Sequence, residues 1–466
     1  MIRRTDLTMM TTKTEPSSQK RFWLITAIAL GTMLNPLNTS MIAVAFSRLQ
    51  EEFEVGYSAI SWLIATYYVA SAVAQPVMGK LGDLFGRKRL FLIGLGLVTL
   101  SSMLAPLSTS IGWLMAFRVI QAIGTSALFP SGMGIIRQVV TTNLARTLGI
   151  MSIFSSTSAA FGPSVGGFLL HYSDWPALFM INFPVILISF VLAVRLMPKD
   201  GAAKKPENGA LDGWGIAFFI VLIVTWLFFF LSIQSGINWW LLAAGLGLSA
   251  GFYAFEAKRR HPFVDVRFLA GNRQVTLVYA QFILVNIVFY SVMFGIPSYL
   301  QQVREFDSQQ VGLLMLAISG FGVVVTPLVG RWIDRAGSKI PLITGSLIVL
   351  SGTLLLLTLH DNTSQVWIFS VLAVLGISSG FHNLGLQSTL YASVATTETG
   401  IASGLFMTSR FMGTILSSSL LGAAFGHGIT TGKLHGLAVA CAVISVLILW
   451  LSLRLPARAG AVKRAS

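Results

Sequence analysis

Long apolar stretches, each about as long as a bilayer is thick, follow one another along almost the whole chain. A run of about twenty apolar residues forms a helix that crosses the hydrocarbon region. Fourteen such windows lie near residues 23–46, 60–79, 90–109, 112–135, 147–171, 177–196, 214–233, 238–256, 275–300, 309–331, 340–359, 366–389, 400–424 and 435–454. The pattern therefore predicts an all-α integral membrane protein with fourteen transmembrane helices.

The composition supports a membrane location. Hydrophobic residues make up 54% of the 466 positions and charged residues 11%, so a soluble core could not bury the apolar surface. The formal net charge of +15 is spread over loops and tails, which leaves no folded basic domain for nucleic acid. We expect the basic residues to lie against anionic lipid headgroups instead.

The distribution of basic residues predicts the orientation of the chain. With a cytoplasmic N-terminus and fourteen crossings, 27 of the 32 Lys and Arg residues fall in cytoplasmic segments. Arg48, Arg304 and Lys433 fall outside, and Arg118 and Arg410 lie within spans. The positive-inside rule requires such an asymmetry. We therefore expect a multi-pass protein of an inner or plasma membrane with both termini in the cytoplasm.

A charged segment, GKLGDLFGRKR at 79–89, recurs in degenerate form as GRWIDRAGSK at 330–339. Pro76, Gly79, Asp83, Gly86 and Lys88 return 251 positions later as Pro327, Gly330, Asp334, Gly337 and Lys339. The repeat indicates two related halves, each with a charged turn between its second and third helices. The first segment resembles the signature loop of the major facilitator superfamily of secondary transporters, which has the form GxLaDrxGrkr.

The distance between the two copies exceeds that of six helices with short loops, by about the length of two more helices. LDGWG at 211–215, FEAKRRHPFVDVRF at 255–268 and WPALFMINFP at 175–184 resemble the fourteen-span drug:proton antiporter branch. The resemblance implies a major facilitator fold of two six-helix bundles plus two inserted helices. The expected segments are a cytoplasmic tail at 1–22, an N-terminal bundle at 23–197, a linker with the inserted pair at 198–272, a C-terminal bundle at 273–456 and a tail at 457–466.

The first signature loop is the expected gate. Gly79 and Gly86 permit a tight turn between two helices, and Asp83 can cap a helix N-terminus or pair with Arg87. Such a contact can tie helices together in one state and release them in another. Asp334 is the counterpart in the second half. The alternative is that the loop is only a positively charged topology anchor.

The fourth span carries RVIQAIGTSALFP at 118–130, which resembles the second motif of the superfamily. Arg118 and Gln121 lie one turn apart and share one helix face. A buried arginine costs at least about 2.5 kcal/mol on insertion scales and normally faces a cavity or a partner. We therefore interpret both residues as substrate or coupling residues, the alternative being that Arg118 snorkels to the interface.

The fifth span carries FGPSVGGFLL at 161–170, which is similar to a motif shared by exporters of the superfamily. Pro163 removes a backbone donor and would kink the helix. Gly162, Gly166 and Gly167 would let a neighbouring helix approach closely. The resemblance implies export rather than import.

Asn38 in the first span departs from the branch pattern. Relatives often read LDxTIVNVALP where this chain reads LNTSMIAVAFS at 37–47, so an amide replaces the acid. None of the seventeen carboxylates falls near the middle of a predicted span. Asn35 lies one turn before Asn38 on the same face. Both are candidate substrate or coupling residues, the alternative being hydrogen bonding between helices.

The second half offers a polar lining for a central cavity. The candidate substrate or coupling residues there are Gln281, Asn286, Tyr290, His382, Asn383, Gln387 and Arg410. His382 is the histidine expected deep in a span, and an ordinary imidazole pKa of about 6.5 suits a proton carrier. The alternative is that His382 is a neutral hydrogen-bonding group.

The sequence contains no P-loop, no zinc-ligand spacing and no nucleophile with a base, so we expect neither an enzyme nor a cofactor or metal. The leading hypothesis is a monomeric transporter that exports a small amphipathic drug or metabolite by alternating access in exchange for protons. One alternative is an exporter or facilitator of an anionic or zwitterionic metabolite or lipid that lacks a membrane-centred carboxylate. A transport-dead sensor or scaffold is a second, and a membrane enzyme ranks last.

The fourteen-span topology is tested at Thr363, in the predicted outer loop after the eleventh span. A cysteine introduced there should react with a membrane-impermeant thiol reagent added from outside. The parent chain supplies the background, because its single Cys441 lies within the last predicted span. Labelling from the cytoplasmic side alone would reject the topology.

Overall fold

A computed structural model describes residues 18–140, 143–200, 212–233, 236–426 and 428–455, and its regular elements are all helices. Most of the predicted tails, and Lys204 and Lys205 of the predicted linker, lie outside these residues. The elements of the first part are α1 (Ser18–Met41), η1 (Ile42–Ala45), α2 (Phe46–Phe53), α3 (Tyr57–Phe85), α4 (Arg87–Leu104), η2 (Ala105–Leu107), α5 (Ile111–Val139), α6 (Leu144–Tyr172), α7 (Ala177–Met180) and α8 (Asn182–Leu196).

The second part continues with α9 (Gly213–Ser232), α10 (Trp239–Glu256), α11 (Val266–Gly271), α12 (Arg273–Gln302), α13 (Ser308–Ala336), α14 (Lys339–Leu355), η3 (Leu356–Thr358), α15 (Gln365–Ser393), η4 (Thr396–Glu398), α16 (Thr399–Phe425) and α17 (Thr431–Arg454). Every predicted apolar window overlaps a helix, with α7 and α8 sharing one window. In the described part of the chain, nine helical segments have both the length and the hydropathy to cross a membrane. The prediction of an all-α membrane fold is confirmed.

The helices begin and end where local chemistry dictates. Asp212 starts α9 by accepting a hydrogen bond from the Gly215 amide at 2.8 Å. Gly86 ends α3 and Gly337 ends α13 with φ angles of +109° and +81°, a backbone conformation that favours glycine. The two equivalent glycines therefore make equivalent turns, as the internal repeat predicts.

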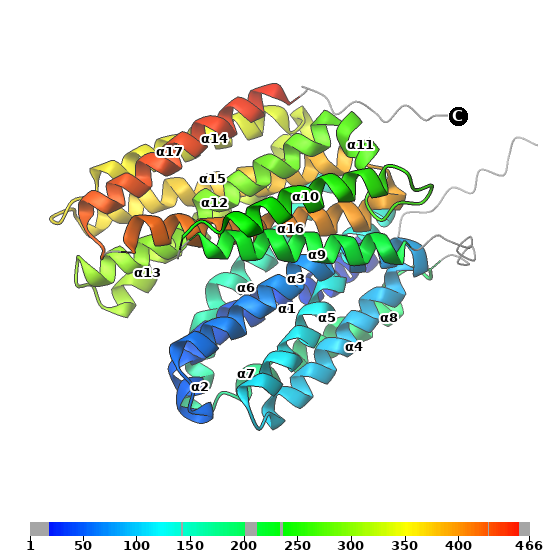
Figure 1. Ribbon diagram of the computed structural model, residues 1–466, viewed down its shortest axis with the longest axis horizontal. Helices are drawn as coiled ribbons and strands as arrows, with labels where there is room; N and C mark the ends of the chain where they lie inside the picture. Colours follow the sequence, from blue (N-terminus) through cyan, green and yellow to red (C-terminus); the bar gives the residue numbers. More distant parts are fainter. Residues whose placement is uncertain (1–17, 141–142, 201–211, 234–235, 427, 456–466) are drawn as a thin grey trace, which may run out of the picture.

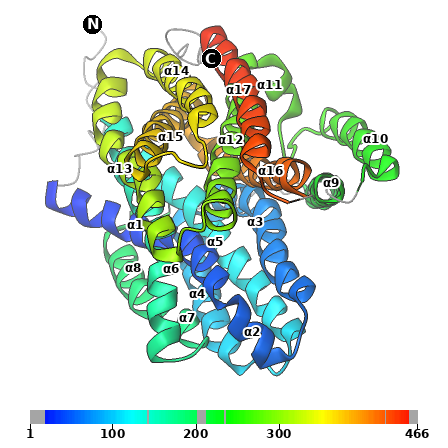
Figure 2. The same ribbon diagram turned by 90° about the vertical axis from the view of Figure 1, so that its left-hand side faces the viewer.

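Helices α1 to α8 form one bundle and α12 to α17 form the other (Figures 1 and 2). Figure 1 shows the bundles meeting at one end and diverging toward the other. The end that carries the turns at Gly86 and Gly337 is called the closed end, and the opposite end is called the open end. Near the closed end α3 lies against α16 and α6 lies against α13.

The inserted helices α9 and α10 lie outside the two bundles, with α9 against α16 and α3 (Figure 2). Phe219 of α9 packs its ring 5.2 Å from Phe263 and 6.0 Å from Phe252 of α10, centroid to centroid. This aromatic cluster is continuous with Phe411 of α16 and Ala72 of α3. The inserted pair is therefore packed onto both bundles at once.

At the open end each bundle is held together by its own contacts. Arg48 of α2 pairs with Asp174 at 2.8 Å, and this hydrogen bond keeps the pKa of the Asp174 carboxyl below its ordinary value. In the other bundle, Arg304 donates to the carbonyl oxygens of His360 and Thr363, each at 2.9 Å. These contacts do not join one bundle to the other.

Gly94 and Gly124 bring the backbones of α4 and α5 together, because a Cβ on Gly94 would lie 2.7 Å from the Gly124 oxygen. Gly94→Val should overpack this contact and cost about 1–3 kcal/mol, seen as a lower Tm of the purified protein. Gly96→Val is the matched control on the same helix, since a Cβ there would meet nothing within 4 Å. Equal Tm values for the two variants would contradict the packing.

Candidate functional site

A polar cluster lies buried inside the first bundle, between α1, α5 and α8. Asn38 and Asn182 exchange hydrogen bonds of 3.0 and 2.9 Å. Gln121 donates to Asn38 at 3.1 Å and accepts from Arg118 at 2.6 Å. The structure thus joins three residues predicted from sequence to Asn182, which the sequence analysis missed although it lies in the WPALFMINFP string.

Arg118 is buried, with 1% of its surface exposed, and no acidic side chain pairs with it in the described part of the chain. Its guanidinium carbon lies 4.2 Å from the centre of the Tyr67 ring, and its Nε finds no hydrogen-bond partner among the residues that the structure describes. Asn35 binds the Tyr67 hydroxyl at 3.2 Å and Thr125 at 3.1 Å, so this residue belongs to the same cluster. A buried cation in neutral surroundings retains the capacity to bind an anion.

Arg410 lies on α16 of the second bundle. Its Nε donates to the Tyr290 hydroxyl at 3.1 Å, and it too lacks a carboxylate partner among the described residues. Tyr68 of α3 lies close enough to interact electrostatically with both Arg118 and Arg410. The two arginines therefore flank the junction of the bundles from opposite sides.

His382 lies in a chain of hydrogen bonds inside the second bundle. One ring nitrogen meets Ser346 at 3.1 Å, Ser346 meets Ser452 at 2.8 Å, and Gln281 donates to Ser452 at 2.6 Å. The other ring nitrogen meets the Ser378 carbonyl at 3.0 Å. Gln281 thus lies at the packing of α12 against α14 and α17, and the contacts of His382 are those of a hydrogen-bonding residue.

Three of the remaining candidates share a small cavity. Asn286, His382 and Asn383 line a volume of about 20 Å³ between α12 and α15, about enough for a single water molecule. Gln387 instead reaches across to the first bundle, where its amide lies 4.0 Å from the Met133 sulfur. The seven polar candidates of the second half are thus distributed among several sites.

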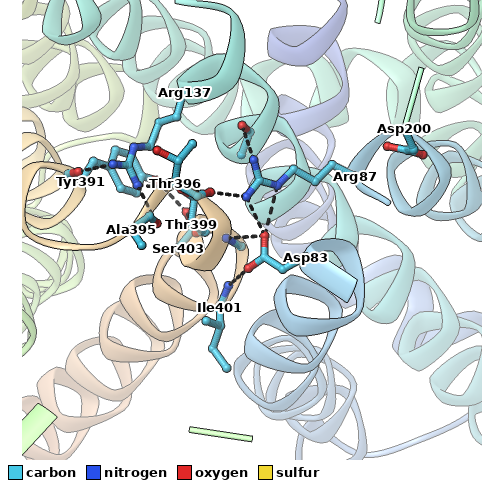
Figure 3. Close-up of polar contacts among 12 residues, drawn as sticks. Asp83, Arg87, Arg137, Asp200, Tyr391, Ala395, Thr396, Thr399, Ile401 and Ser403 are labelled. Atoms are coloured by element: carbon cyan, nitrogen blue, oxygen red, sulfur yellow. Dashed lines mark hydrogen bonds and ion pairs between the residues drawn. The ribbon is translucent and has the colours of Figure 1, made fainter. Parts of the chain in front are cut away.

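The residues of the predicted gate make contacts between the two bundles at the closed end (Figure 3). Asp83, at the end of α3, accepts hydrogen bonds from the amides of Gly400 and Ile401 at 3.2 and 3.1 Å. Arg87 pairs with Asp83 at 2.8 Å and donates to the Thr396 carbonyl. The carboxylate therefore caps the N-terminus of a helix from the opposite bundle, where it is stabilised by the helix dipole.

Asp334 makes the same contact in the reverse direction. Its carboxylate accepts from the amides of Ala145 and Arg146 at 3.0 and 3.1 Å, at the N-terminus of α6. The repeated aspartates of the two halves therefore each cap a helix of the other half. Arg137 adds a contact that sequence reasoning missed, donating to Thr399 Oγ1 at 2.7 Å and to the carbonyl of Tyr391.

Glycines allow α3 and α16 to approach each other closely at the closed end. A Cβ on Gly79 would lie 2.2 Å from the Gly400 oxygen, and one on Gly404 would lie 2.5 Å from the Gln75 oxygen. No side chain fits between these two backbones. The α3–α16 contact is therefore as close as two helices can pack, and it depends on glycine from both bundles.

The exporter-type string packs α6 against α1. A Cβ on Gly162 would lie 1.8 Å from Ser40 Oγ, and one on Gly166 would lie 2.7 Å from Val44 Cγ2. Gly167 faces open space instead. Pro163 lies within α6, and its side chain is outside the described part. Two of the three glycines thus make the predicted close approach.

A family model described as Major Facilitator Superfamily matches residues 28–418. The chain belongs to this superfamily. This facilitator is 43% identical over 417 residues to an uncharacterized MFS-type transporter, YwoD of Bacillus subtilis (strain 168), covering 89% of this chain and 92% of that protein. It is 26% identical to the tetracenomycin C resistance and export protein of Streptomyces glaucescens, covering 85% and 74% of the two chains.

The fold is also similar to a solved structure. The crystal structure of the human organic anion transporter MFSD10 (TETRAN) superposes with a TM-score of 0.70 at 15% identity, covering 93% of this chain and 99% of that chain. The three-dimensional structure therefore confirms the facilitator fold that the sequence match indicates. Membership identifies a membrane transporter and not an enzyme.

Asp83→Asn keeps a capping side chain but removes the charge that interacts with Arg87 and the helix dipole. Hydrogen bonds to charged groups contribute about 1.5–3 kcal/mol, so the closed end should open more often. Spin labels at Arg89 and Thr397, both exposed at the closed end, should report a longer distance. Asp307→Asn is the control, since Asp307 caps its own helix. An unchanged distance in Asp83→Asn would reject the gate.

Proposed function

We propose that this transporter exports a small amphipathic compound by alternately opening its two ends, with the closed end toward the cytoplasm. The carrying observation is the position of Arg118 and Arg410, two cations that pair with no carboxylate among the described residues, beside the junction that Asp83 and Asp334 close at one end. The basic residues of the signature turns support the orientation. The exporter-type packing of α6 on α1 supports the direction of transport.

The charges at the junction favour a neutral, zwitterionic or acidic compound. Asn38 is an amide bonded to Asn182 and Gln121, so it offers a cation no ionic partner. A dication would lose its hydration there without compensation. The name of the Streptomyces glaucescens relative, a resistance and export protein for tetracenomycin C, agrees with export of an organic compound.

The chain shows no motif for ATP hydrolysis, so the energy for export must come from an ion or substrate gradient. Protons are the proposed coupling ions. In proteoliposomes, addition of a transported compound should produce a proton flux in the opposite direction. If the compound moves without any proton flux, the protein is a facilitator that is not coupled to protons. If neither the compound nor protons move, the alternative of a transport-dead sensor or scaffold is favoured.

The charge preference is tested on the two arginines. Arg118→Ala and Arg410→Ala should each weaken binding of an acidic amphipath such as deoxycholate by about 1.5–3 kcal/mol, the range for hydrogen bonds to charged groups. Asn38→Asp should instead improve binding of a bisquaternary amine. Thermal shift of the purified protein measures all three.

Arg410→Lys serves as the control, since it keeps the charge but not the fork of donors. It should retain part of the affinity for deoxycholate. Wild-type protein that binds the bisquaternary amine as tightly as deoxycholate would refute the proposed selectivity.

A further inference from the structure

The inserted pair brings together two strings that lie far apart in the sequence. LDGWG contributes Asp212 at the start of α9, and FEAKRRHPFVDVRF contributes Glu256 at the end of α10. Because α9 and α10 form an antiparallel pair, these two acids meet at the same end. Both acids are buried, with 1% of Glu256 and 9% of Asp212 exposed.

The two carboxylates face one another across Gly215. A Cβ on Gly215 would lie 2.2 Å from Glu256 Oε1 and 2.9 Å from the Asp212 carboxyl carbon. Both oxygens of Glu256 and Oδ2 of Asp212 are buried without a hydrogen-bond partner in the described part of the chain. The two carboxyl groups therefore point into one small space, where Arg259 lies 3.5 Å from Asp212 Oδ2 and the amides of Phe263 and Val264 face Glu256.

A basic side chain lies near each of the two acids, but among the described residues only Asp212 has an ion-pair partner. Arg259 stacks on Phe255 at 4.5 Å and its Nε lies 3.5 Å from Asp212 Oδ2. Lys80 of α3 faces Glu256 but donates to the Pro262 carbonyl at 3.0 Å. Other charged or titratable groups line the neighbouring cavity, namely Arg260, His261, Asp265, Tyr279 and Glu398. Asp83 on α3, Tyr253 on α10, Lys258 in the segment after it and Arg267 on α11 are the further groups on adjoining elements, and the amides of Phe263 and Val264 face Glu256.

Burying a second carboxylate anion without an ion-pair partner costs much free energy of desolvation. A protonated carboxyl group costs far less to bury, and it has a hydroxyl group that can donate a hydrogen bond. One hydroxyl between the two acids would satisfy oxygens on both, as in carboxylate pairs that share a proton. A divalent metal fits less well, because no third acidic, His or Cys ligand joins the pair in the described residues. The chemistry of the space thus matches a single proton.

We propose that Asp212 and Glu256 form a proton-binding site that fastens the inserted pair to the closed end. With the proton bound, Glu256 donates its hydroxyl hydrogen to Asp212 and the two helix ends stay together. When the proton leaves to water, two adjacent anions remain and repel each other. The start of α9 and the end of α10 then separate.

This separation would act on the gate through the segment 257–265. Pro262 in that segment is bound by Lys80, one turn before Asp83 on α3. The same segment, α3, α12 and α16 enclose a cavity of about 280 Å³ whose lining includes Ile401, the residue that binds Asp83. Loss of the proton would therefore loosen a wall shared by both bundles. The site itself does not depend on the proposed direction or cargo of transport.

Infrared difference spectroscopy on the purified full-length protein tests the site directly. Between about pH 5 and about pH 9, a range that covers shifted carboxyl groups, we expect a C=O band of a buried protonated carboxyl that disappears as the pH rises. The band should be lost in Glu256→Gln and kept in Glu51→Gln, which neutralises a carboxylate whose side chain is 73% exposed. A band unchanged in Glu256→Gln would overturn the proposal.

A second variant covers the case in which Glu256→Gln does not fold. Gly215→Ala places a methyl group between the carboxylates and should remove or shift the band, while Gly213→Ala, where a Cβ meets nothing within 4 Å, should not. A wild-type protein that shows no such band, but gains thermal stability on addition of Na⁺ or Ca²⁺, would overturn the proposal in favour of a metal cation.

The link to the closed end has its own measurement. The distance between spin labels at Arg89 and Thr397 should lengthen with rising pH in the wild type and stay short at all pH values in Glu256→Gln. A pH-independent distance in the wild type would refute the fastening role. Neither measurement requires transport, so both can succeed even where export of an amphipath is disproved.

Discussion

The structure depends on carboxylates that cap helix N-termini across the junction of two bundles. Asp83 binds amides of α16 and Asp334 binds amides of α6, so each half holds a helix of the other. A capping contact is strong while the carboxylate and the first amides are aligned, and it is lost once they separate by a few ångströms. Such a contact suits an interface that must form and break repeatedly.

The close packing of α3 against α16 around these contacts means that the contacts at the closed end form or break together. Gly79, Gly400 and Gly404 let two backbones touch, and a small shift removes the whole set of contacts at once. At the open end, Arg48 and Arg304 instead bind within their own bundles. These contacts are consistent with the proposed movement of the bundles as two bodies about the junction that contains Arg118 and Arg410.

Charge is separated in this transporter between the junction and the inserted pair. The junction holds Arg118, Arg410 and the buried amides around Arg118, whereas Asp212 and Glu256 are buried at the ends of α9 and α10. If the junction binds the cargo as proposed, the lack of a carboxylate there discriminates against cations. A titratable site placed outside the cargo path can respond to pH without competing with the cargo for one residue.

The sequence by itself determined the all-helical membrane fold, the internal repeat and the superfamily. Apolar windows of bilayer length and turn-forming glycines depend only on residues that are neighbours in the sequence. Their effect on the fold can therefore be predicted without knowing which distant residues they meet. The sequence also identified Asp83, Arg118 and Arg410. Only the tertiary structure decided their partners, because Asn182, Arg137 and Gly404 carry no local signal that they face a distant helix. The burial of Glu256 beside Asp212 was decided in the same way, since a carboxylate at a span end reads as solvated until packing closes over it.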